Sequence, residues 1–168
     1  PFIRIQDLAV KNPPDRPAKR ISPDAEKAYA RTRLKGGEIL LAVVGATIGK
    51  IGVAPDSWRG ANIARAVCRI VPSPKVDRDF LVHVLQSQDV QDCFHTATRT
   101  LAQPTLNLGQ LVQTRIPVPP LTEQRRIVAE LNALQAELDA LKCLQAETAA
   151  ELAALLPAIL DQAFKGEL

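Results

Sequence analysis

The chain has no methionine, two histidines, three cysteines and few aromatic residues, which make up 4% of its 168 residues. With so few rings, its core must be built mostly from Leu, Ile, Val and Ala. No apolar run approaches the roughly 18 to 20 residues that cross a bilayer, and no signal peptide is recognisable. We therefore expect a cytoplasmic protein with no membrane partner. Since methionine is missing even at position 1, we expect a fragment of a longer protein.

The cysteines and histidines show no spacing of a disulfide framework or a metal site. Cys68, Cys93 and Cys143 are odd in number and never form a Cys-x-x-Cys pair. His83 and His95, even with Cys93 nearby, match no common zinc spacing. We expect reduced, structural thiols and no bound metal.

Charge is divided unevenly along the chain. Residues 1–115 hold 17 Lys and Arg against 10 Asp and Glu, whereas residues 116–168 hold 4 against 8. The densest positive stretch is 1–35, with nine basic and four acidic side chains. A basic domain is expected of a polyanion binder, because neutralised phosphates release condensed counterions. A solvated surface of arbitrary sign remains the alternative.

Apolar patterning predicts a mixed body. Four prolines make 11–24 an exposed loop, and the glycine-bracketed apolar run at 36–45 is typical of a buried strand. The expected elements are strands within 1–9, 36–45, 48–53 and 64–71 and a helix over 77–93. The expected fold class is α+β, a mixed, mostly-β domain with a few helices.

The last third carries a leucine ladder with the spacing of a coiled-coil seam. A proline step at 116–120 precedes it, and Thr122 is the expected N-cap of a helix that reaches about Leu156, roughly 50 Å at 1.5 Å per residue. Pro157 is expected to kink or restart the helix, and Gly166 to close it. The seam, which we expect to pair with another helix, consists of Ile127, Leu131, Leu134, Leu138, Leu141, Leu152, Leu155 and Ile159. We expect domains at 1–119 and 120–168.

Three short motifs are similar to catalytic ones but lack essential parts. Gly45 to Lys50 is one residue short of a phosphate-binding loop, and Ile51 stands where a magnesium-binding hydroxyl should be. These glycines indicate a tight turn or a close approach, so Lys50 is equally a turn residue or a phosphate contact. The run 12–15 is similar to a methyltransferase Asn-Pro-Pro-aromatic loop but ends in Asp. The run 23–27 holds the residue types of a nuclease carboxylate cluster but compresses them into one turn, whereas metal-dependent cleavage normally gathers carboxylates from separate strands. We expect no enzyme.

The segment 99–107 is polar and interrupted by Pro104. Gln and Asn can read adenine edges and Arg can read guanine, so this loop is a candidate base reader. The same residue types also stabilise ordinary turns, and the sequence leaves both interpretations open.

Several motifs together resemble the specificity subunits of type I restriction-modification systems, over about residues 35–168. The most specific is the step from Pro119 to Gln124, Pro-Pro-Leu-Thr-Glu-Gln, with a long helix after it. The others are Gly37-Glu38-Ile39-Leu40, Gly45-x-x-x-Gly49-Lys50, Ala61-Asn62, Thr105-Leu106-Asn107-Leu108 and the ending 156–168.

This resemblance implies the carboxyl half of such a subunit. It would hold one target recognition domain at 1–119, truncated at its N-terminus, and one conserved spacer helix at 120–168 that pairs as an antiparallel coiled coil. In that family the subunit reads part of a bipartite double-stranded DNA site and is not itself catalytic. The implied partners are the modification subunit, the restriction subunit and either another copy or the missing half. S-adenosylmethionine, ATP and magnesium are expected on partner subunits and no cofactor on this chain.

Basic and amide side chains of the body are the candidate DNA contacts. They are Lys19, Arg20, Arg31, Arg33, Lys50, Arg59, Arg65, Arg99, Gln103, Thr105 and Asn107. The competing hypothesis is a coiled-coil interaction module whose body binds protein rather than DNA.

Overall fold

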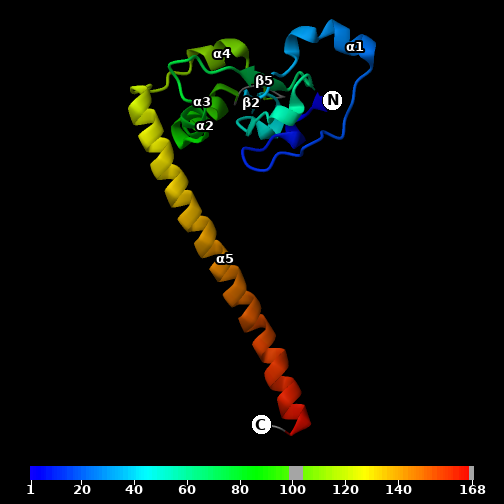
Figure 1. The fold of residues 1–168 in the computed structure, drawn as a ribbon, viewed down its shortest axis with the longest axis vertical. Helices are drawn as coiled ribbons and strands as arrows, with labels where there is room; N and C mark the ends of the chain where they lie inside the picture. The colour runs from blue at the N-terminus through cyan, green and yellow to red at the C-terminus, as the bar shows by residue number, and fades with distance from the viewer. Residues whose placement is uncertain (99–103, 167–168) are drawn as a thin grey trace. The chain divides into compact units, whose positions relative to one another are not determined.

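A computed structural model of the chain describes residues 1–98 and 104–166. The chain divides into two compact units, Pro1–Arg125 and Arg126–Leu168. The first unit mixes short strands with helices, and the second belongs to one long C-terminal helix (Figure 1). The expected α+β class is therefore confirmed.

The centre of the first unit is a three-stranded antiparallel sheet in the order β3-β2-β5. Its strands are β2 (Ile39–Ala42), β3 (Ile51–Val53) and β5 (Val67–Ile70). All four residues of β2 are buried, because the strand lies between two neighbours and is covered on both faces. This explains why its sequence is a continuous apolar run rather than an alternating one.

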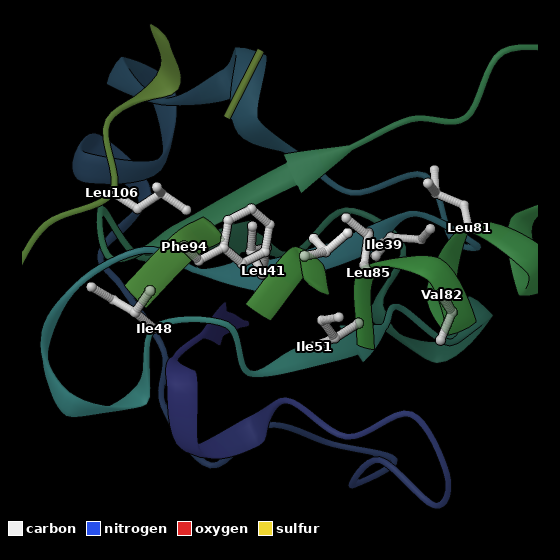
Figure 2. Close-up of a cluster of buried hydrophobic side chains, with 10 residues drawn as sticks. Ile39, Leu41, Ile48, Ile51, Leu81, Val82, Leu85, Phe94 and Leu106 are labelled. Atoms are coloured by element: carbon white, nitrogen blue, oxygen red, sulfur yellow. The ribbon is translucent and has the colours of Figure 1, made fainter. Parts of the chain in front are cut away.

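One face of the sheet packs against two helices, α2 (Arg78–Gln86) and α3 (Gln88–Thr98). Ile39 and Leu41 point from β2 into this cluster, where they meet Leu85 of α2 and Phe94 of α3 (Figure 2). The single helix predicted over 77–93 is thus wrong. Ser87, the single residue between α2 and α3, adopts an extended conformation with ψ 148° and so ends α2. Its hydroxyl donates a hydrogen bond to the carbonyl of Val84.

The opposite face of the sheet covers a second cluster. Leu40 and Ala42, the alternate residues of β2, pack there with Ile3 and Trp58. Ile3 belongs to β1 (Phe2–Ile3), which pairs in parallel with β4 (Asn62–Ile63). The strand expected within 1–9 is therefore only two residues long. A 3-10 turn, Ile5–Asp7, follows it, where the Asp7 carboxylate accepts a 2.8 Å hydrogen bond from the Arg4 amide.

Short helices border the remaining loops of this unit. The proline-rich stretch expected as a loop has no regular structure until Pro23, where α1 (Pro23–Ala28) begins, and a 3-10 turn, Ala30–Thr32, follows. Two further 3-10 turns, Gly45–Thr47 and Asp56–Trp58, connect the strands. The sequence pattern did not predict α4 (Leu108–Gln113), which lies after the polar segment.

The C-terminal helix, α5 (Leu121–Lys165), has 45 residues, a length of roughly 68 Å at 1.5 Å per residue. It begins at Leu121, so Thr122 lies inside the first turn and is not the N-cap. The sequence predicted that the helix would end near Leu156 and restart at Pro157. Instead, α5 continues through Pro157 and remains helical to Lys165. Gly166 follows with φ +73°, the left-handed conformation that glycine supplies at helix ends. Among the described residues, no helix is long and apolar enough to span a membrane.

Candidate nucleic-acid interface

The polar segment after Pro104 is attached to the end of the central strand. The Leu106 amide donates to the carbonyl of Val43 at 2.8 Å, and the Gly45 amide donates to the carbonyl of Pro104 at 2.9 Å. On the other side, the Val43 amide donates to the carbonyl of Ala66. The chain just beyond β2 therefore joins two segments that are distant in sequence, one around Arg65 and the other around Thr105.

Where these segments meet, the surface is hollowed by a volume of about 470 Å³, which we call the arginine hollow. Its polar lining comes from Arg31, Thr32, Arg65, Arg69, Thr105 and Asn107, and apolar side chains such as Val44 and Ile63 complete it. Four of these six polar residues are candidate DNA contacts from the sequence. The structure thus brings Arg31, Arg65, Thr105 and Asn107 together.

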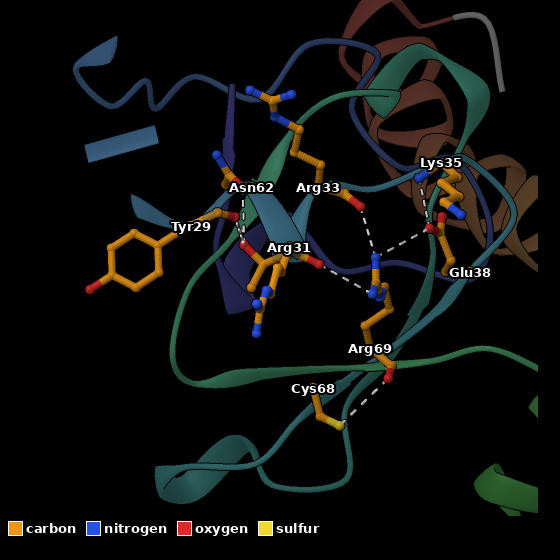
Figure 3. Close-up of polar contacts among 9 residues, drawn as sticks. Tyr29, Arg31, Arg33, Lys35, Glu38, Asn62, Cys68 and Arg69 are labelled. Carbon is orange, nitrogen blue, oxygen red and sulfur yellow. Dashed lines mark hydrogen bonds and ion pairs between the residues drawn. The ribbon is translucent and has the colours of Figure 1, made fainter. Parts of the chain in front are cut away.

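Arg69, which the sequence analysis missed, organises one wall of the arginine hollow. Its guanidinium donates to the carbonyl of Arg33 at 2.7 Å and to that of Arg31 at 3.4 Å (Figure 3). It also lies 3.9 Å from the carboxylate of Glu38, which is 5% exposed and accepts from the Lys35 amide at 2.6 Å. These contacts tie the segment 31–35 to β5. An arginine inside the apolar run 67–71 was the available signal.

The wall is also fixed from β4. The Thr32 hydroxyl lies 2.8 Å from the carbonyl of Tyr29 and 3.0 Å from the side-chain oxygen of Asn62, which is 1% exposed. The buried side-chain oxygen of Asn62 is thus satisfied by the hydroxyl of half-buried Thr32. The backbone on both sides of Arg31 is therefore held, while the Arg31 side chain is exposed.

Asn107 also caps the N-terminus of α4, besides lining the hollow. Its side-chain oxygen accepts from the Gln110 amide at 2.9 Å, and the Gln110 side chain accepts from the Asn107 amide at 3.0 Å. This reciprocal pair is a capping box that starts α4. The Asn-x-x-Gln spacing before an apolar residue was the sequence signal for the helix.

Three of the other basic candidates have partners elsewhere on the body. Arg33 forms an ion pair with Glu26, and Arg59 one with Asp56 at 3.0 Å. The Lys50 ammonium donates to the carbonyl of Ile5 at 3.2 Å. All three side chains remain exposed to solvent. Exposed ion pairs such as the first two are worth only about 0 to 1 kcal/mol.

The remaining candidates lie outside the arginine hollow or outside the described residues. Lys19 and Arg20 are exposed in the proline-rich loop, and Arg20 borders a separate hollow of about 170 Å³ with Arg16 and Asp15. Arg99 and Gln103 fall in the segment that the structure does not describe.

Gln124, which the sequence analysis named only as the end of the Pro-Pro-Leu-Thr-Glu-Gln motif, is a second residue whose structural role it missed. It is completely buried, and its side-chain amide donates to the carbonyls of Pro119 and Lys75 at 2.7 and 3.1 Å. Its oxygen accepts from the Asp77 amide at 2.7 Å, next to the start of α2. The first turn of α5 is therefore bound to the body by one side chain. Composition and periodicity gave no signal for it, because glutamine is ordinarily exposed.

The seam of α5 is open to solvent. Its leucines and Ile159 are between 37% and 64% exposed, while Ile127 near the start of the helix is half-buried. A contiguous apolar face of this kind marks an interaction surface. Among the described residues, no group of three or more His, Cys, Asp or Glu side chains could hold a metal ion.

A chain that has both an arginine-lined hollow and a long helix with an exposed apolar face shows the pattern of a nucleic-acid-binding subunit that assembles with other chains. The family model described as "Type I restriction modification DNA specificity domain" matches residues 1–148. The chain therefore belongs to the family of type I restriction-modification specificity proteins.

Individual relatives agree with this assignment. The chain is 34% identical over 151 residues to the type I restriction enzyme EcoBI specificity subunit of Escherichia coli, covering 89% of this chain and 31% of that protein. It is 30% identical over 110 residues to the MjaVIII specificity subunit of Methanocaldococcus jannaschii, covering 63% and 26% respectively. The chain thus spans about a third of the length of these curated relatives or less.

Solved structures of the same family have the same fold. A chain in a structure of a type I restriction-modification system, described by its complex assembly and conformational transition, matches all of this chain and 39% of its own length, with TM-score 0.72 and 32% identity. The HsdS subunit of Thermoanaerobacter tengcongensis matches 80% of this chain and 31% of its own length, with TM-score 0.57 and 36% identity.

Proposed function

We propose that this chain reads part of a bipartite double-stranded DNA site as one half of a specificity subunit. Residues 1–119 would form the target recognition domain and 120–168 the spacer helix. The observation that carries the proposal is the arginine hollow, whose polar lining of three arginines, two threonines and an asparagine is completed by apolar side chains.

The chemistry of the arginine hollow suits a duplex. Arginine binds phosphate as a fixed fork of donors, and it also binds the major-groove edge of guanine through two hydrogen bonds. Arg31 and Arg65 are exposed and suited to such contacts, whereas Arg69 is committed to the backbone of residues 31 and 33. We assign Arg31 and Arg65 to direct contact and Arg69 to positioning.

The assembly would follow the division of labour in the family. This chain would supply recognition without catalysis, in the cytoplasm where the DNA lies. Methylation with S-adenosylmethionine and ATP-driven cleavage with magnesium would belong to the modification and restriction subunits. The exposed seam of α5 would bind a helix from another copy or from the missing half. No observation favours the alternative of a coiled-coil module that does not bind DNA.

The test is DNA affinity as a function of salt. We would measure fluorescence anisotropy with a panel of labelled duplexes, in the presence of the modification subunit, for the wild-type chain and the variant Arg31→Ala/Arg65→Ala. If each arginine neutralises one phosphate, the slope of log affinity against log salt should fall by about 2. Arg78→Ala, at an exposed arginine paired with Asp79 on α2, is the matched control and should leave the slope unchanged.

Two results would reject the proposal. One is an unchanged affinity and salt slope in the double variant. The other is a wild-type complex that shows no preference among the duplexes, since a reader must discriminate sequences.

A further inference from the structure

A second cavity, which we call the apolar pocket, lies next to the arginine hollow. It has a volume of about 380 Å³, and its apolar walls come from Phe2, Ile21, Tyr29 and Ile63. Ile63 lines the arginine hollow as well. Cavities of roughly 300 to 1,000 Å³ with mostly apolar walls and a few polar groups are typical of small-ligand sites. The apolar pocket is therefore large enough for a planar ring.

Tyr29 presents an accessible aromatic ring at this pocket. Its backbone is fixed, because its carbonyl accepts from the Thr32 hydroxyl at 2.8 Å and its amide donates to the carbonyl of Glu26 at 3.1 Å. Tyr29 is nevertheless 56% exposed, and its ring extends away from Arg69 and Glu38 (Figure 3). An exposed aromatic ring on a fixed backbone offers a stacking surface for another ring.

Asn62 adds a polar group to the apolar pocket. It lines the pocket and is only 1% exposed. Its side-chain oxygen is bonded to the Thr32 hydroxyl, whereas its amide nitrogen forms no hydrogen bond within residues 1–98 and 104–166. A buried donor without an acceptor is costly, so a suitable occupant supplies an acceptor at its edge.

Basic side chains border the apolar pocket. Arg65 is exposed and lines both this pocket and the arginine hollow. Lys19 is exposed too, and its carbonyl accepts from the amide of Phe2 at 3.0 Å. A phosphate bound by Arg65 would therefore place its nucleotide beside the pocket. An apolar side chain of a protein partner would fill the same space but would leave Asn62 without an acceptor.

We propose that the apolar pocket receives one unstacked base of the bound DNA, which stacks on Tyr29 and accepts from Asn62 while its phosphate stays on Arg65. This inference rests on the proposed reading of DNA and adds a specificity pocket to it. Proteins that extrude a base hold it in this way, between aromatic or apolar side chains and a few hydrogen-bonding groups. Tyr29 and Asn62 are then specificity-determining residues.

Bulged duplexes test the pocket for any target sequence, because a bulged base is already unpaired. One set of labelled probes carries a single bulged nucleotide with each of the four bases. The comparison probe carries a bulged abasic nucleotide, which has the same extra backbone but no base. Affinities are measured by fluorescence anisotropy at one salt concentration, for the full chain with the modification subunit.

Two variants of Tyr29 assign the capture of the base to this chain. They are needed because methyltransferases extrude bases themselves. Tyr29→Ala removes the stacking ring at an exposed position, and the matched control Tyr29→Phe keeps it. The wild-type chain and Tyr29→Phe should bind at least one bulged base about tenfold more tightly than the abasic probe, the effect of stacking one base. In Tyr29→Ala this ratio should fall toward one, with the affinity for the abasic probe unchanged.

Three results overturn the inference while DNA is still bound, so the proposed function stands. The first is a wild-type ratio of one for all four bases, as expected when the pocket binds a protein side chain. The second is a ratio that Tyr29→Ala leaves unchanged, which places the captured base on the modification subunit. The third is loss of the ratio in Tyr29→Phe, because the stacking ring is still present. Absence of binding to every probe and to the fully paired duplex rejects the proposed function, and the inference with it.

Discussion

Replacement of Gln124 by methionine should weaken the body by about 3 kcal/mol. Methionine has nearly the same volume and shape, so packing in this fully buried site is kept. It makes none of the hydrogen bonds to Pro119, Lys75 and Asp77. A hydrogen bond contributes about 1 kcal/mol net, and the backbone groups left without partners add to this loss where they are buried. The change is large beside a typical total stability of about 5 to 15 kcal/mol.

Urea unfolding followed by tryptophan fluorescence measures this loss of stability in the body, the unit Pro1–Arg125. Trp58 is the sole tryptophan and is completely buried between the sheet and the N-terminal segment, so its emission reports the body and not α5. The control is Gln86→Met, the same substitution at the exposed last residue of α2. A midpoint for Gln124→Met equal to that of the control would refute the reasoning, because the buried amide would then contribute nothing.

Three further predictions concern the thiols, the wall of the hollow and the long helix. Burial raises the pKa of the Cys68 thiol, which lowers its thiolate fraction, so at pH 8 iodoacetamide should modify the exposed Cys93 and Cys143 first and Cys68 much more slowly, as seen by peptide mass spectrometry. Arg69→Lys keeps the charge but loses the forked contact to two carbonyls, so it should cost about 2 kcal/mol and weaken DNA binding; unchanged urea midpoints and affinity would contradict its positioning role. Pro157→Ala should raise the thermal midpoint of α5 in circular dichroism, by up to about 3 kcal/mol of helix stability, without changing its helical content in the cold.

The parts of the fold that depend on local pattern were predictable from the sequence. The apolar run at 36–45 predicted the buried central strand, and the leucine spacing predicted the long helix. The two ends of that helix were harder to place. Propensity rules expect Pro157 to interrupt a helix, but a long run of good helix formers on both sides outweighs one missing hydrogen bond.

The parts that depend on tertiary contact were not predictable. Arg31, Arg65 and Thr105 were chosen for their chemistry, but only the attachment of residues 104–106 to the end of β2 shows that they share one hollow. The burial of Gln124 has the same origin, since the Pro-Pro-Leu-Thr-Glu-Gln motif pointed to its position but only the contacts with Lys75 and Asp77 show that its side chain is buried. Asn107 is an intermediate case. Its capping spacing was visible, although its polar character drew attention to base reading.

The attachment at Gln124 makes the two ends of α5 unequal in stability. One terminus is held by the buried Gln124 amide, whereas the other ends at Lys165 and is followed by Gly166 in the left-handed conformation. Fraying of an unpartnered helix therefore starts at the carboxyl end and travels toward the body. Amide protons near Leu160 should exchange with solvent fastest, and those near Val128 should persist until the body itself unfolds.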